Sequence, residues 1–166
     1  MLDQAMPQSV GGTSVIERSL RTILYTGLTA GMLDITAAFT NTWLHGRGLI
    51  VVVQSIAGGL LGRSAYQGGL KTAALGLVLH FIIATIWGAV YYAASLKLPL
   101  LTRRAVPCGL FYGVVVYLVM YGVVLPLSAL RVPPLNQAPT AMLTSVLIHM
   151  FCVGLPIALM VRRHTD

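Results

Sequence analysis

Four apolar stretches, each long enough to cross a lipid bilayer as a helix, constrain the fold of this chain more than any other feature. A helix needs about 20 mostly apolar residues to cross the hydrocarbon core. The stretches cover about residues 22–43, 72–95, 106–127 and 140–161, and short basic segments separate them. The sequence therefore predicts an all-α fold, an integral membrane four-helix bundle that forms a single membrane domain over residues 1–166.

The composition supports a membrane environment for these stretches. The chain is 57% hydrophobic and only 9% charged, whereas soluble domains carry about 25% charged residues. The formal net charge is +7, but the basic residues lie between the apolar stretches rather than on one face with interleaved aromatics. This distribution is typical of contact with anionic lipid headgroups and argues against nucleic-acid binding. We therefore expect the lipid bilayer, and no nucleic acid, as a partner.

A fifth apolar run, residues 49–62, is too short to cross the bilayer as a helix. Its 14 residues rise only about 21 Å along a helix, against about 30 Å of hydrocarbon. Gly58 and Gly59 permit a turn within the run. We expect a re-entrant or interfacial segment between the first two spans.

The N-terminal segment carries a helix-start pattern. In a capping box, a Ser or Thr side chain caps the first turn and a Glu three residues later reaches back to it. Ser14 and Glu17 have this spacing. The sequence therefore predicts a first helix that begins near Val15 and a flexible segment over residues 1–13.

The basic residues also predict the orientation of the spans. Lys and Arg are enriched in the cytoplasmic loops of membrane proteins. With four spans, the side of the termini holds seven of them and the opposite side four: Arg18, Arg21, Lys97, Arg103, Arg104, Arg162 and Arg163, against Arg47, Arg63, Lys71 and Arg131. This excess predicts that both termini are cytoplasmic. A fifth span would remove it, which favours four spans.

One acidic residue, Asp34, lies inside a predicted span. The chain has four acidic residues, and the other three lie near its ends. A charged side chain at the bilayer centre costs at least about 2.5 kcal/mol, so it normally faces protein or water. His80 and His149 lie in the second and fourth spans, where a rise of about 1.5 Å per residue places them at a similar depth. We therefore treat these three residues as candidates for a proton relay or a ligand site.

Several interpretations of Asp34, His80 and His149 remain open. In the first, neutral histidines form hydrogen bonds with Asp34, Ser145 or carbonyl groups, and the protein is a purely structural membrane subunit. In the second, Asp34 and a histidine exchange protons in a path for protons or a small solute. In the third, the histidines bind haem b, or with Asp34 a transition metal, for electron transfer. Lipid handling and assembly with a membrane partner are further alternatives.

Motifs of well-known enzyme classes are missing from the sequence. There is no HExxH, GxSxG or P-loop pattern. A pair of carboxylates within the membrane is impossible, because Asp34 is the only one there. We therefore expect no enzymatic activity and no catalytic residue. Gln54, Ser55 and Arg63 are candidates for a polar access route beside the bundle.

Two sequence features occur twice. Gly27-x-x-x-Gly31 in the first span matches Gly109-x-x-x-Gly113 in the third, and the histidines of the second and fourth spans lie in similar apolar sequences. A duplicated helical hairpin would give this pattern. GxxxG is also common wherever membrane helices pack closely, including between copies of one chain. The four glycines are therefore candidates for helix packing, and a homo-oligomer stays open.

Five segments carry a resemblance to a known family: Gly31–Ala38, Gln54–Arg63, Leu79–Phe81, Val124–Ser128 and Ile148–Met150. They resemble small, multi-span proteins of the bacterial inner membrane, the YagU-like group, over about residues 22–162. The resemblance implies a location in the bacterial inner (cytoplasmic) membrane and supplies no established site. We hypothesise a non-enzymatic membrane protein whose Asp34 and histidines support proton-linked passage of a small solute or ion. Haem b or metal binding is the alternative.

Overall fold

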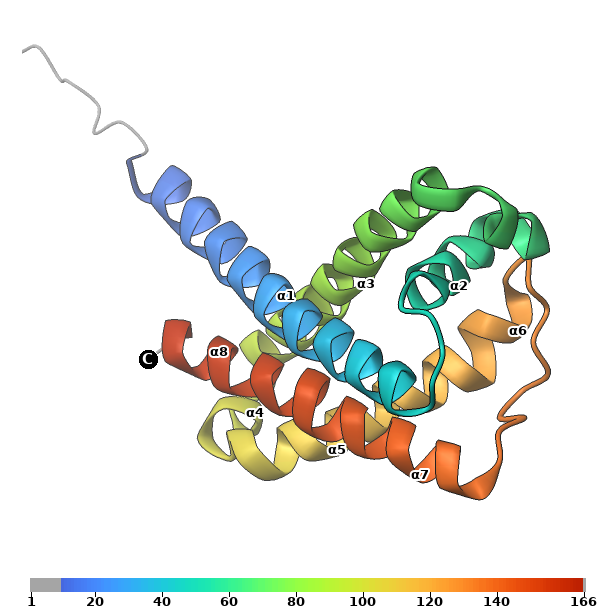
Figure 1. Cartoon of the computed structure of the whole chain (residues 1–166). Coiled ribbons are helices and arrows are strands. Elements are labelled where there is room, and N and C mark those ends of the chain that lie inside the picture. The colour runs from blue at the N-terminus through green and yellow to red at the C-terminus, as the bar shows by residue number, and fades with distance from the viewer. Residues whose placement is uncertain (1–9, 166) are drawn as a thin grey trace, which may run out of the picture.

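Helices joined by loops make up the part of the chain that the computed structural model describes, residues 10–165 (Figure 1). Side chains are described from Val15 to His164. No strand occurs in this range, so the predicted all-α class is confirmed.

Four long helical rods form the bundle. The first two are α1 (Val10–Leu44) and α3 (Gly69–Lys97). The third consists of α5 (Ala105–Val119), the π-helix η2 (Met120–Val124) and α6 (Leu125–Leu127). The fourth consists of α7 (Pro139–Ile148), the π-helix η3 (His149–Gly154) and α8 (Leu155–Thr165). Within the described residues, four stretches are long and apolar enough to cross a membrane: Val15–Leu44, Gly69–Lys97, Ala105–Leu127 and Pro139–His164.

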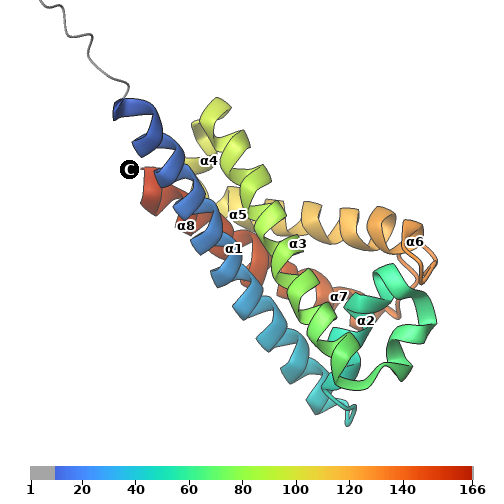
Figure 2. The same ribbon diagram turned by 90° about the horizontal axis from the view of Figure 1, so that it is seen from above.

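Successive rods run in opposite directions. Because there are four of them, the start of the first rod and the end of the fourth lie at the same end of the bundle. The start of α1, the end of α3, the short α4 (Leu100–Arg103) and the end of α8 lie at one end of the bundle, here called the terminal end (Figures 1 and 2). The end of α1, α2 (Ile50–Leu61), α6 and the start of α7 lie at the other, here called the loop end. The bundle therefore has the up-and-down order that four spans predict.

The first helix begins earlier than its sequence pattern predicts. It starts at Val10, so residues 10–13 of the predicted flexible segment are helical, while residues 1–9 lie outside the described part. Glu17 does not reach back toward a cap. Its carboxylate accepts a hydrogen bond from the Arg21 guanidinium at 2.6 Å, one helical turn later. Because the helix starts at Val10, Ser14 lies inside it and not at the cap position that the capping box requires.

The short apolar run forms α2, which packs on α3 at the loop end. The two helices come so close that a Cβ on Gly76 would overlap the Val53 carbonyl oxygen. The Gln54 amide donates to the Gly69 carbonyl at 3.1 Å, and the Gly59 carbonyl accepts a hydrogen bond from the Ala129 amide at 2.9 Å. The 3₁₀-helix η1 (Gly62–Gln67) leads back to α3. The position of this segment relative to a bilayer stays a prediction.

Two π-helices precede the prolines of the third and fourth rods. Proline lacks an N–H group, and its ring clashes with the carbonyl four residues earlier in an α-helix. In this fold, η2 ends at Val124 and η3 at Gly154, each two residues before a proline, Pro126 and Pro156. The wider π turn moves that carbonyl away from the ring. The disturbance of the fourth rod before Pro156 thus takes the form of a π-helix.

The repeated glycines lie where helix backbones meet. A Cβ on Gly27 would approach the Thr85 Cα to 2.5 Å, and one on Gly31 would contact the Phe81 ring at 2.8 Å. These contacts join α1 to α3. In the same way, Gly109 and Gly113 of α5 face η3 and α8: a Cβ on Gly113 would lie 2.5 Å from the Met150 Cα. Each GxxxG pair therefore holds one helical hairpin together.

One of two hydrophobic core clusters fills the terminal end of the bundle. Tyr91, Ile157 and Val161 are at most 1% exposed there and pack in one cluster. The Tyr91 hydroxyl donates to the Leu101 carbonyl at 3.0 Å, so its buried polar atom is satisfied. This packed layer closes the interior between the terminal end and the middle of the bundle.

The glycine contacts predict a specific loss of stability. Gly113→Ala places a Cβ against the η3 backbone, and overpacking of this kind costs about 1–3 kcal/mol. We expect a lower thermal midpoint in detergent, followed by circular dichroism. Gly122→Ala is the matched control, because a Cβ at Gly122 meets no atom within 4 Å. Equal midpoints for the two variants would contradict the packing.

The up-and-down order predicts the sides of two loops. Gly48 lies between α1 and α2 at the loop end, and Thr102 lies in α4 at the terminal end. Single cysteines at these positions, with both native cysteines changed to serine, should react with an impermeant maleimide from opposite faces of sealed vesicles. Labelling from one face would refute four spans.

Candidate functional site

A cavity of about 370 Å³ lies between the rods, and α2 forms part of its wall at the loop end. Every rod contributes to its wall, together with Ser55, Ile56 and Gly59 of α2. Its size is at the lower end of the range for small-molecule sites, about 300–1,000 Å³. On α1 the lining residues follow one helical face: Ala30, Asp34, Ala38 and Asn41. The cavity therefore extends from the middle of α1 toward its end at Leu44.

Asp34 is the charged group of this cavity. It is half-buried, and it precedes the end of α1 by ten residues, which is about 15 Å of helix rise. No side chain described in the structure donates a hydrogen bond or forms an ion pair with its carboxylate, and the Glu17–Arg21 pair is the only ion pair among these residues. A carboxylate at this depth needs a partner. The cavity that Asp34 lines has room for such a partner.

His80 reaches the cavity from α3 and is tied to α1. It is 8% exposed, and its Nε2 lies 2.9 Å from the Gly31 carbonyl oxygen. A carbonyl only accepts, so Nε2 carries the proton and donates it. Gly31 makes the bond possible because its missing side chain lets α3 approach. In the neutral ring, Nδ1 keeps a lone pair that can accept a proton.

His149 reaches the cavity from η3. Its Nδ1 donates to the Ser145 carbonyl of the preceding turn at 2.8 Å. The rings of Tyr117 and Tyr121 meet its ring edge-on, with centroid distances of 5.6 and 6.0 Å. No described side chain forms a hydrogen bond with its Nε2. In the neutral ring this nitrogen is an acceptor.

The structure thus brings Asp34, His80 and His149 to one cavity without joining them. All three line its wall, yet none forms a hydrogen bond with another. The two histidine–carbonyl bonds are those that the structural interpretation predicts. The relay interpretation requires water or a solute to connect the three groups. Both interpretations therefore retain support.

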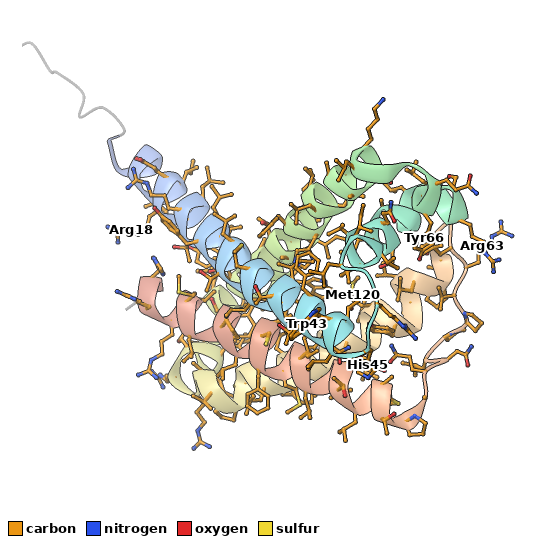
Figure 3. All side chains as sticks on the ribbon, viewed as in Figure 1. Arg18, Trp43, His45, Arg63, Tyr66 and Met120 are labelled. Carbon is orange, nitrogen blue, oxygen red and sulfur yellow. The ribbon has the colours of Figure 1, made fainter. Side chains whose placement is uncertain are left out.

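The three candidates for a polar access route lie in different places, and only one of them lines the cavity. Ser55 lines the cavity, with its hydroxyl bonded to the Val52 carbonyl at 2.7 Å. Gln54 is 4% exposed and points to α3 instead. Arg63 is exposed on η1 and lies beside Tyr66 at the edge of the loop end (Figure 3). Gln54 and Arg63 are therefore not part of the cavity wall.

The wall also contains aromatic residues that the sequence did not single out as part of a site. Trp87 and Tyr121 both line the cavity. Trp87 follows His80 by seven residues, and that spacing places both on one face of a helix. Tyr121 lies in η2, where the π turn changes the face that the regular period would assign. The spacing signal was available for Trp87 but not for Tyr121.

The ligand geometry does not favour a metal site. Among the described residues, no three His, Cys, Asp or Glu side chains lie close enough to hold an ion together. Haem b would need one nitrogen with a free lone pair from each histidine, and the hydrogen bonds leave Nδ1 of His80 and Nε2 of His149 for that role. Haem binding stays a prediction that no contact in the structure favours.

Comparison with family models, curated proteins and solved structures finds no match to this chain. The resemblance to the YagU-like group stays a prediction. The cavity and its lining are therefore the features of this chain that bear on a function.

Proposed function

We propose that this protein passes a small solute or ion across a membrane in a proton-linked manner, with Asp34 as the central binding group. One observation carries the proposal. The Asp34 carboxylate lines a cavity within a candidate span and has no partner among the described side chains. An ionisable residue in such a position is by default part of a functional path. The bilayer we propose is the bacterial inner membrane.

The residues around Asp34 support the proton-linked part. The carboxylate can exist with or without a proton, and each neutral histidine keeps one nitrogen that can accept one. Since all three groups line the same cavity, water within it can carry protons among them. A solute with a positive charge competes with a proton for the single carboxylate. Such competition is the basis of exchange between the two.

The closure of one end supports alternating access. The cavity reaches the loop end at Asn41, Thr42 and Ser128, while packed core residues fill the terminal end. Passage therefore requires a second arrangement in which the core separates. The π-helices η2 and η3 line the cavity and interrupt the regular backbone bonding of two rods. We expect η2 and η3 to change conformation between the two arrangements. With cytoplasmic termini, the cavity would face the outside of the cell.

A structural subunit is the second candidate. The bonds from His80 to Gly31 and from His149 to Ser145 favour it, because each gives one ring nitrogen of a histidine a partner without any ligand. This candidate does not explain why Asp34 has no partner among the described side chains.

Proton flux into liposomes tests the proposal. Asp34→Asn removes the protonatable carboxylate, so flux under a pH gradient should fall by about tenfold or more. An enclosed pH-sensitive dye gives the rate. Glu17→Gln is the matched control, because Glu17 is exposed near the start of α1. Equal flux in wild type and Asp34→Asn would remove Asp34 from any path.

A second variant tests the same path without changing Asp34, so the test remains valid if Asp34→Asn fails to fold. A Cβ on Gly59 meets no atom within 4 Å, although Gly59 lines the cavity. Gly59→Phe should therefore narrow the cavity and slow the flux without lowering the thermal midpoint. Gly48→Phe is its control, since Gly48 is equally open and lies outside the wall. An unchanged rate in Gly59→Phe would place the path elsewhere.

A further inference from the structure

The wall of the cavity contains an acidic side chain but no Lys or Arg. Asp34 lines it, but none of the 11 Lys and Arg residues of the chain does. We propose that the solute is a small organic cation with a single positive charge, such as a protonated amine or a quaternary ammonium compound. This inference rests on the proposed function, whose solute it names. One carboxylate balances one positive charge, while an anion would meet Asp34 without any counter-charge.

The size and lining of the cavity distinguish an organic cation from a metal ion. Hard inorganic cations take six or more oxygen ligands when they lose their water. The wall offers one carboxylate, and most of its other side chains are apolar, such as Ile35, Ile83 and Val116. A volume of about 370 Å³ is far larger than the share of one water molecule, about 30 Å³. An apolar body with a charged head matches both features.

Two aromatic residues of the wall suit an ammonium head. Trp87 and Tyr121 line the cavity from α3 and η2. Aromatic faces attract cations by about 0.5–2 kcal/mol, and Trp is the strongest of them. Both rings are held in place by neighbours. Trp87 packs edge-on against Tyr112 at a centroid distance of 6.1 Å, and Tyr121 lies 4.8 Å from Tyr117. A fixed aromatic wall lowers the entropic cost of binding.

The two tryptophans allow a direct binding assay. Trp43 is 69% exposed at the end of α1, and Trp87 is the only other one in the chain. In Trp43→Phe protein, fluorescence therefore reports on the cavity alone. The protein is placed in nanodiscs of uncharged lipid and titrated with tetraethylammonium chloride. Triethylcarbinol and sodium triethylacetate serve as neutral and anionic probes of similar shape, and potassium chloride as the inorganic cation.

We expect a saturable change in Trp87 fluorescence with tetraethylammonium and none with the other three probes at equal concentration. Asp34→Asn should weaken this binding by about tenfold or more, while Glu17→Gln leaves it unchanged. Tyr121→Leu, which keeps the Asp34 carboxylate, should weaken the binding of tetraethylammonium by about three- to tenfold. This variant keeps the test valid if Asp34→Asn fails to fold. Equal binding of the neutral or anionic probe, or binding of potassium instead, would overturn the inference.

The binding experiment tests the ligand class and the flux experiment tests the transport role, so either one can be contradicted without the other. Cation binding that depends on Asp34, without flux in liposomes, would support the ligand class and overturn the transport role. Proton flux that depends on Asp34, without cation binding, would overturn the ligand class and support the transport role.

Discussion

Close backbone contact at glycines is the interaction on which the rest of this structure depends. Lipid offers little hydrophobic drive for helices to associate, so membrane helices rely on tight packing and interhelical hydrogen bonds. Gly27 and Gly31 bring α1 against α3, and Gly109 and Gly113 bring α5 against the fourth rod. The same contact positions His80, because only a close approach lets its ring reach the Gly31 carbonyl. Beyond these contacts the rods diverge toward the loop end, and α2 occupies the space beside α3 (Figure 1). The cavity is the part of that space that α2 leaves unfilled.

Much of the fold, and three of the residues that meet at the cavity, could be predicted from the sequence. The lengths of the apolar stretches gave four spans, because helix rise is constant. The same arithmetic placed Asp34, His80 and His149 at one level, and all three line one cavity. Which face each residue occupies was harder to predict, since α3 and α5 are apolar all round and carry no polar stripe to mark their inner side. Gln54 illustrates the failure: it looks like a wall residue but bonds to Gly69 instead. The π-helices were also out of reach, because a proline predicts a disturbance but not its form.

The two hairpins are alike in packing and differ at the cavity. In each, a GxxxG pair packs on the helix that carries a histidine, Gly31 beside Phe81 and His80, and Gly113 beside His149. A duplication would produce this arrangement, and close packing alone would also favour it. The histidines nevertheless differ in their bonds. His80 donates to the facing helix, whereas His149 donates within its own helix. The His149 ring meets the third rod edge-on at two tyrosine rings, Tyr117 of α5 and Tyr121 of η2.

In the proposed function, water and small cations reach Asp34 from the loop end. A cysteine at Ala38, one turn after Asp34 on the cavity wall, tests it most directly. Ala158→Cys is the matched control, because Ala158 is fully buried in the core and outside the wall. Both variants are made in a chain whose native cysteines are serine, and a trimethylammonium-ethyl thiosulfonate reagent is added on the loop side of the membrane. The structure predicts rapid modification of Ala38→Cys and none of Ala158→Cys. An Ala38→Cys variant as unreactive as Ala158→Cys would contradict an accessible cavity at Asp34.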